Sequence, residues 1–94
     1  MIKVMIERII IPGLEPDYEN FSRSILQQAL HADGFISGES LKDAEHPNHR
    51  FIFTLWRDHS AWQRWNRSPE RNEISGTIAA MLAEPEKVTV LEHL

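Results

Sequence analysis

The side chains best suited to recognise an aromatic molecule are gathered in residues 53–67, FTLWRDHSAWQRWNR. This segment contains every tryptophan of the chain, Trp56, Trp62 and Trp65, with arginines between them. Indole rings beside cations suit three roles: stacking on nucleic-acid bases, lining a small-molecule pocket, or packing in a core. Base stacking requires a continuous positive groove, whereas the formal net charge is -4. The composition therefore excludes a general nucleic-acid binder, and the arginines are expected at the surface.

The three tryptophans are expected to differ in role. Trp65 either packs between a helix and the sheet or forms a pocket wall whose indole N–H orients a substrate oxygen. Trp62 precedes it by one helical turn and is expected at an edge or a dimer contact. Trp56 ends a predicted strand and belongs to the core, beside the same pocket. Tyr18 and Ser37 can add hydroxyl groups to that pocket.

Glu7 is the candidate for a general base. It alternates with Met5 and Ile9 along the first predicted strand, so its face of the sheet is apolar. A carboxylate in such surroundings either pairs with a cation, such as Arg50 or Arg57, or acts as a base in a dry pocket. As a base it would remove a proton from a phenolic or acidic C–H substrate, and the resulting carbanion could react directly with oxygen.

The sequence has little that would support a metal site, thiol chemistry, a phosphate-binding loop or a serine nucleophile. His46 and His49 have the spacing of two metal ligands, but they lie in a flexible turn and no metal site is expected. The absence of cysteine excludes disulfides, thiol catalysis and thiolate metal sites. The sequence contains neither a phosphate-binding glycine loop nor a serine nucleophile motif. We therefore expect no cofactor.

The candidate residues must be positioned by a single domain, residues 1–94. Apolar and β-branched runs predict strands at 2–11, 35–42, 50–57 and 87–93, and apolar spacing predicts helices at 16–32, 59–66 and from 69 to before 85. This order, βαββαβ, predicts a ferredoxin-like α+β fold in which helices cover one face of a four-stranded antiparallel sheet. Both faces of the first strand are mostly apolar, so a second copy is expected to cover the open face.

The sequence also indicates the cellular compartment of the protein. No apolar run approaches the roughly 20 residues that span a bilayer. The N-terminal segment is interrupted by Lys3, Glu7 and Arg8, and no small-residue cleavage site follows it. We therefore expect a cytoplasmic protein with no membrane partner.

Four segments resemble the antibiotic biosynthesis monooxygenase (ABM) domains, a family of small dimeric α+β barrel proteins. They are VMIERIIIPG, ADGF, FTLWRDHSAWQRW and KVTVLEHL, and the resemblance covers nearly the whole chain. It implies a homodimer whose two sheets close a barrel, with a pocket in each subunit between the sheet and its own helices. Some members of this family oxidise polycyclic aromatic substrates with molecular oxygen and without metal or flavin. Others degrade haem, and many have no known activity.

The haem-degrading branch of the family depends on an asparagine, a tryptophan and a histidine. Trp65 matches the tryptophan, whereas Glu7 stands at the asparagine position and Ser75 at the histidine position. Because the histidine is the axial haem ligand, the resemblance argues against haem degradation in this chain.

We therefore expect a cofactor-independent monooxygenase that acts on a small aromatic, phenolic or quinone-type molecule in a sheet–helix pocket. Glu7 and Trp65 are the catalytic candidates, and Trp56, Tyr18 and Ser75 are the substrate-binding candidates. The alternative is a non-catalytic dimer of the same fold that binds a small molecule or serves as a stress or signalling accessory. The loss of two of the three haem-branch positions favours this alternative.

Overall fold

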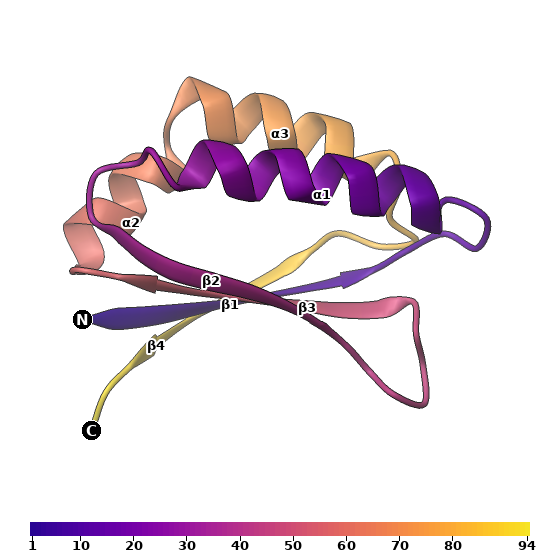
Figure 1. Cartoon of the computed structure of the whole chain (residues 1–94), viewed down its shortest axis with the longest axis horizontal. Helices are drawn as coiled ribbons and strands as arrows, with labels where there is room; N and C mark the ends of the chain where they lie inside the picture. Colours follow the sequence, from indigo (N-terminus) through magenta and orange to yellow (C-terminus); the bar gives the residue numbers. More distant parts are fainter.

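In the computed structural model, which describes all 94 residues, three helices cover one face of a four-stranded sheet (Figure 1). The elements are β1 (Ile2–Ile9), α1 (Glu15–Ala29), β2 (Phe35–Lys42), β3 (His49–Trp56), α2 (His59–Asn66), α3 (Pro69–Ala79) and β4 (Lys87–Glu92). The ferredoxin-like α+β prediction is confirmed, with the second helical region divided into α2 and α3. All strand pairs are antiparallel, as predicted, and β2 and β3 are joined as a hairpin.

The strand order is β2-β3-β1-β4, so β1 lies between β3 and β4. Val4 of β1 stands opposite Thr54 of β3 and Val90 of β4. Because successive side chains of a strand point to opposite faces, the even positions of β1 face the helices and the odd positions face away. This alternation decides which candidate residues can share a pocket.

Helix α1 is shorter than the predicted span of residues 16–32. The amides of His31 and Ala32 bond to carbonyls three residues back, so the chain tightens after Leu30 instead of adding another α-helical turn. The chain then reverses at Gly34, whose φ is 85°.

No helix of the structure combines the length and hydrophobicity that a bilayer crossing requires.

Side-chain caps explain why two helices replace one after β3. Oδ1 of Asp58 accepts a hydrogen bond of 2.8 Å from the amide of Ala61, which starts α2. Oγ of Ser68 accepts one of 3.1 Å from the amide of Arg71, which starts α3, with Pro69 in its first turn. The prediction of separate helices at 59–66 and from 69 is therefore confirmed.

The core between sheet and helices has two parts. The first is built by Ile2, Val4, Ile6, Trp56, Ala61 and Trp62, and the second by Ile10, Tyr18, Ile78 and Leu82. Trp62 is only 4% exposed, so the expectation of an edge or dimer contact is wrong. Its ring packs at 62° to that of Trp56 with centroids 5.7 Å apart, because the cap at Asp58 turns this face of α2 toward the sheet.

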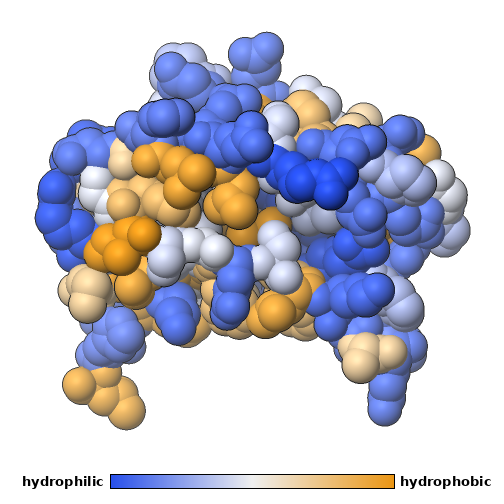
Figure 2. Space-filling view, viewed as in Figure 1, coloured by the Kyte–Doolittle hydropathy of each residue, from blue (hydrophilic) through white to orange (hydrophobic).

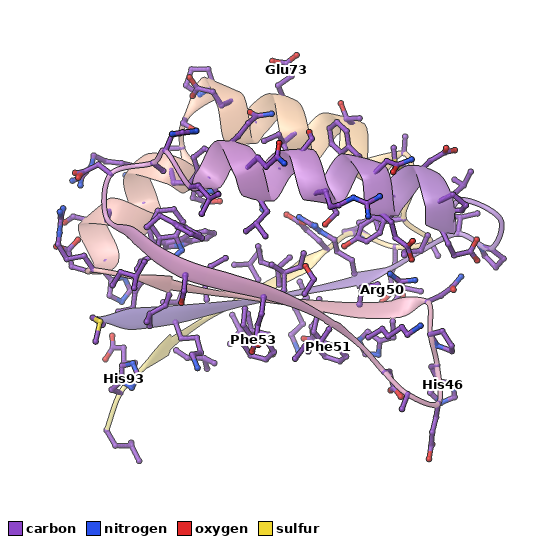
Figure 3. The ribbon with its side chains drawn as sticks, in the orientation of Figure 1. His46, Arg50, Phe51, Phe53, Glu73 and His93 are labelled. Carbon is purple, nitrogen blue, oxygen red and sulfur yellow. The ribbon has the colours of Figure 1, made fainter.

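The other face of the sheet carries no helix. Phe51 and Phe53 of β3 point away from the helices (Figure 3), and their register partners in β1 are Glu7 and Met5. Apolar residues are visible along the sheet side of the molecule, below the helices (Figure 2). The prediction of a largely apolar sheet face that the helices of the chain leave uncovered is confirmed.

Candidate functional site

A small cavity of about 40 Å³, here called the inner chamber, lies between the helices and the helix-facing side of the sheet. Its wall is formed by Ile6, Arg8, Ser22, Ile25, Leu26, Ala29, Ser40, Ile52, Thr54, Trp56, Trp62, Trp65 and Arg71. A cavity that binds benzene has a volume of about 150 Å³, and a water needs about 10–15 Å³. The inner chamber therefore admits water or a diatomic molecule but not an aromatic ring.

A larger open hollow of about 380 Å³, here called the vestibule, lies between α1 and the β2–β3 edge. Its lining is Tyr18, Glu19, Ser22, Arg23, Leu26, Ser40, Leu41, Lys42, Arg50, Phe51 and Ile52. Ser22, Leu26, Ser40 and Ile52 line both spaces, so the vestibule adjoins the inner chamber. Apolar side chains show between α1 and β2 in the space-filling view (Figure 2). The vestibule is large enough for an aromatic substrate.

The tryptophans of the inner chamber are not equivalent. Trp56 is fully buried, and its Nε1 donates a hydrogen bond of 2.9 Å to Oγ1 of Thr54. Trp65 is half-buried and stacks at 27° on Trp56 with centroids 6.4 Å apart. No hydrogen bond joins the Trp65 indole N–H to another protein atom, and it is not sealed from solvent. Trp65 thus has the donor that a ligand oxygen could accept from, whereas Trp56 supplies an apolar wall.

A buried charge cluster forms the polar side of the inner chamber. Nε of Arg8 donates to Oε2 of Glu86 at 2.8 Å, and Nη2 of Arg71 donates to Oε1 of the same carboxylate at 2.6 Å. The side chains of Arg8 and Arg71 are 2% and 4% exposed, and that of Glu86 is 18% exposed. Two buried guanidinium groups therefore share one carboxylate, which leaves one positive charge beside the chamber.

The ionisation of Glu86 follows from this arrangement. Burial by itself raises the pKa of its carboxyl, but the charges and hydrogen bonds of Arg8 and Arg71 outweigh burial and hold that pKa below its ordinary value. Glu86 is therefore an ionised counter-charge and a weak proton acceptor.

Two of the substrate-binding candidates contact this cluster. Nη1 of Arg8 donates to the hydroxyl of Tyr18 at 3.3 Å, and Tyr18 lines the vestibule. The guanidinium groups of Arg8 and Arg50 each lie 5.9 Å from the centre of the Tyr18 ring. Oγ of Ser75 accepts a hydrogen bond of 2.6 Å from Nη1 of Arg71. Ser75 lines neither space, so it holds Arg71 in place.

Glu7 lines neither the inner chamber nor the vestibule. As an odd-numbered residue of β1 it faces away from the helices, so it does not line the chamber with Trp56 and Trp65. This corrects the expected common pocket, and the catalytic role of Glu7 stays a prediction. Its Oε1 lies 3.4 Å from Nε2 of His49 on the neighbouring strand.

The cations expected to pair with Glu7 have other partners. Arg50 faces the helices and pairs with Glu19 at 3.1 Å. Arg57 pairs with Asp33 and Asp58, each at 3.3 Å. Of the partners expected for Glu7, Arg50 and Arg57 are therefore excluded, because neither side chain reaches the uncovered face near Glu7, and the basic side chain beside it is that of His49.

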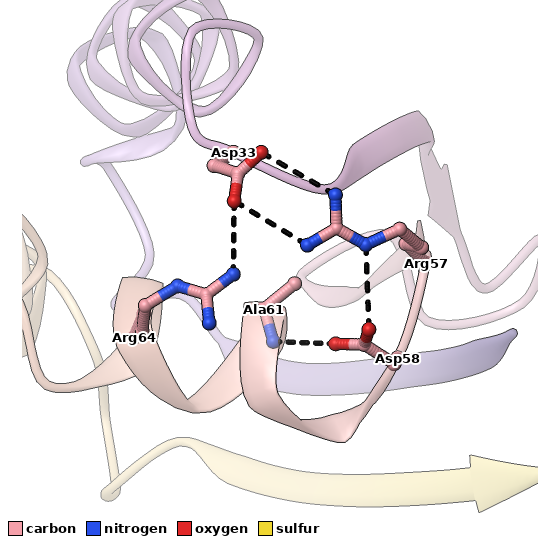
Figure 4. A network of polar contacts seen from close by, with 5 residues as sticks. All are labelled: Asp33, Arg57, Asp58, Ala61 and Arg64. Carbon is pink, nitrogen blue, oxygen red and sulfur yellow. Dashed lines mark hydrogen bonds and ion pairs between the residues drawn. The ribbon is translucent and has the colours of Figure 1, made fainter.

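Two arginines of the tryptophan segment, Arg57 and Arg64, lie in a surface network beside the start of α2 (Figure 4). Asp33 binds Arg57 and also Nη2 of Arg64, at 2.9 Å. Hydrogen bonding from Arg57, and then its charge, lowers the pKa of the Asp33 carboxyl. Oδ1 of Asp58 caps Ala61 while Oδ2 contacts Arg57. Arg57 and Arg64 are thus paired at the surface and Arg67 is exposed, so the expected surface position of all three is confirmed.

The charge cluster was not predicted, although part of its signal is local. Arg8 occupies a core-facing position among Ile6 and Ile10, where a cation must find a buried partner. Arg71 precedes Ile74 by three residues on the buried face of α3. Glu86 lies in an irregular segment, where no periodicity marks it. No three histidine, aspartate or glutamate side chains come together as a metal site.

Comparisons with known proteins agree with this architecture. The family model described as "Antibiotic biosynthesis monooxygenase" matches residues 1–75. No curated protein sequence matches the chain. A conserved protein from Methanosarcina mazei Go1 has a TM-score of 0.93 at 18% identity, covering 99% of this chain and 92% of that one. An antibiotic biosynthesis monooxygenase structure has a TM-score of 0.90 at 16% identity, covering 100% and 99%. A mutant of SnoaB, a cofactor-independent oxygenase from Streptomyces nogalater, has a TM-score of 0.85 at 15% identity, covering 98% and 92%.

Proposed function

The chain belongs to the antibiotic biosynthesis monooxygenase family, and we propose that it is a cofactor-independent monooxygenase of small aromatic, phenolic or quinone-type substrates. The observation that carries this proposal is the tryptophan-lined chamber that adjoins an open vestibule. The similarity in fold to SnoaB, a cofactor-independent oxygenase, supports the same reaction class.

The sizes of the two spaces suggest that the vestibule binds the aromatic substrate and the inner chamber binds dioxygen. An aromatic ring fits the vestibule of about 380 Å³, against Leu26 and Ile52, and not the chamber of about 40 Å³. Dioxygen is small and apolar, so the chamber beside Trp56 and Trp65 suits it. The reactive carbon would then lie at the junction of the two spaces, beside Leu26 and Ile52, and a substrate oxygen that enters the chamber could accept from the Trp65 N–H.

The proposed reaction needs only substrate electrons. A methylene carbon next to a phenolic ring, as in an anthrone, gives a proton to water in the open vestibule and becomes a carbanion that transfers electrons to oxygen; that proton ends in the water that is formed. The balance is R₂CH₂ plus O₂ giving R₂C=O plus H₂O, so one oxygen atom enters the product and the other leaves as water. The protein's tasks are to bind the ring, stabilise the anion and limit access of water.

We also propose that the functional unit is a homodimer in which the uncovered sheet faces pack together. Met5, Phe51 and Phe53 give this face its apolar surface, and no helix of the subunit covers them. Packing sheet against sheet would remove that surface from water. Glu7 would then lie at the interface, paired or as a base for a ligand that reaches it.

A non-catalytic dimer that binds a small molecule is the second candidate. It is favoured by the lack of an unengaged carboxylate in the site: Glu19 pairs with Arg50, and Glu86 pairs with two arginines. Under this alternative, ligands bind in the vestibule and no oxygen is consumed.

Oxygen uptake with a panel of quinols and anthrones, without added metal or flavin and with a chelator present, tests the proposal. Turnover by the wild type that falls at least about tenfold in Trp65→Phe supports it. Glu7→Gln tests the predicted base, with Glu39→Gln on the same sheet face as the matched control. If Trp65→Phe keeps full activity, the assignment of the chamber as the site is wrong, and if Glu7→Gln keeps full activity, Glu7 is not the base. No uptake across the panel would contradict the monooxygenase proposal.

A further inference from the structure

The side chains that line the inner chamber and the vestibule are mainly positive, whereas the chain as a whole is negatively charged. The formal net charge is -4, with ten lysines and arginines in total. Five of these ten line the two spaces: Arg8 and Arg71 in the chamber, and Arg23, Lys42 and Arg50 in the vestibule. The carboxylates available to balance them are Glu19 and Glu86. An acidic protein thus has a positive site, which attracts anionic ligands.

The inner arginines also keep hydrogen-bonding capacity. Arg8 uses Nε for Glu86 and Nη1 for Tyr18, and no protein atom accepts from its Nη2. Arg71 uses Nη1 and Nη2, and no protein atom accepts from its Nε. Neither nitrogen is sealed from solvent without a partner. Both residues line the inner chamber, so a ligand oxygen that enters it would lie close to guanidinium groups that keep unused donors.

Tyr18 extends this donor set to the vestibule. Its hydroxyl oxygen accepts from Arg8, so its own hydrogen remains free to be donated. A guanidinium group that donates to the oxygen makes that hydroxyl a stronger donor. A ligand oxygen at the junction of the two spaces would therefore meet a donor from Tyr18 on the vestibule side and guanidinium donors beyond it.

We propose that Arg8, Arg71 and Tyr18 form a binding subsite for an anionic oxygen, and that the ligand is bound as a phenolate, enolate or carboxylate. A purely structural role explains the cluster less well, because a buried ion pair is often no more stabilising than apolar side chains of similar volume. A single carboxylate with two buried arginines leaves a positive charge that a ligand anion would balance. A phenol or enol entering this subsite would release its proton to solvent through the vestibule.

This inference deepens the proposed function by naming the substrate class, yet binding can be tested without turnover. Calorimetric titration under nitrogen compares anthraquinone-2-carboxylate with anthraquinone-2-carboxamide, which share the ring and differ in charge. We expect the carboxylate to bind at least tenfold more tightly to the wild type. Arg71→Gln and Tyr18→Phe should reduce this preference, while Arg67→Gln, at an exposed arginine outside both spaces, should keep it.

A second measurement uses only the wild-type protein, in case the arginine variants fail to fold. The absorbance of 4-nitrophenol reports its ionisation, and we expect its pKa to fall when it binds. Equal affinity for the carboxylate and the carboxamide, or an unchanged or raised pKa of bound nitrophenol, would overturn the subsite. Charge preference without oxygen uptake would instead refute the monooxygenase proposal and leave the subsite standing. Oxygen uptake without charge preference would refute only the subsite.

Discussion

Nε of Arg8 and Oε2 of Glu86 lie 2.8 Å apart although 78 residues separate them in the chain. The pair joins the central strand β1 to the segment that precedes β4, and Arg71 of α3 completes it from the helix layer. One carboxylate thereby connects three parts of the fold and neutralises part of the charge beside the inner chamber. Its removal should affect both stability and the site.

Glu86→Gln removes the counter-charge of two buried arginines while keeping nearly the same shape. Because breaking a buried pair leaves uncompensated charge, we expect the free energy of unfolding near pH 7 to fall by about 3 kcal/mol. Urea denaturation followed by circular dichroism measures this loss. Glu84→Gln, at an exposed glutamate in the same segment, is the control and should change stability little. Equal stability of the two variants would show that the cluster is not an important stabilising contact.

The same variant should alter the response to pH. The pKa of Glu86 is lower in the folded protein than its ordinary value of 4.5. Its contribution is therefore fully present above that value and is lost as the pH falls through the lowered folded-state pKa. The stability difference between wild type and Glu86→Gln should stay constant from about pH 7 to about pH 5 and shrink on further acidification. A difference that grows on acidification would contradict the assigned pKa direction.

Thr54→Val should destabilise the tryptophan core. The substitution keeps the shape of the side chain but removes the acceptor of the Trp56 indole N–H, a bond of 2.9 Å between buried residues. Leaving this donor unpaired should reduce the free energy of unfolding by about 2 kcal/mol. Thr54→Ser keeps the hydroxyl, loses one methyl group, and should cost about 1 kcal/mol. Thermal unfolding distinguishes them, and a valine variant as stable as the wild type would refute the role of this bond.

Gly34→Ala should be more harmful than Gly13→Ala. Both glycines have positive φ, 85° at Gly34 and 97° at Gly13, so alanine at either site is strained by about 1–2 kcal/mol. Only at Gly34 would the added Cβ collide with Cβ of Ala61, whereas Gly13 faces open space. Overpacking should therefore make Gly34→Ala less stable than Gly13→Ala by about a further 2 kcal/mol, measured by urea denaturation. Similar losses for both variants would mean that α2 shifts away without cost.

Phe53→Glu should disrupt the proposed dimer. The substitution places a charge on the uncovered sheet face, where it would be buried between two subunits. Light scattering at micromolar concentration should report a dimer for the wild type and a monomer for the variant. Leu30→Glu, at a 59% exposed residue next to α1, adds the same charge on the helix side and should remain dimeric. A wild-type monomer would refute the sheet-to-sheet dimer, as would an unaffected Phe53→Glu dimer.

Local patterns in the sequence determined the elements and the two faces of β1. The alternation of Val4, Ile6 and Arg8 with Met5 and Glu7 survives in the structure because strand side chains alternate at every step. Ser68 and Asp58 stand at helix starts for an equally local reason, since a cap bonds an amide only three residues ahead. The approximate bounds of strands and helices followed from such patterns.

Only the tertiary structure decided which candidates share a site. The sequence pattern predicts Glu7 and Trp65 in one pocket, but the position of a residue along a strand does not show which sheet face the helices will cover until the strands pair. The meeting of Arg8, Arg71 and Glu86 depends on the strand order and on how α3 lies over β1. Contacts across such long separations are set by packing of the whole chain, so the sequence identified the tryptophans while the fold identified their charged neighbours.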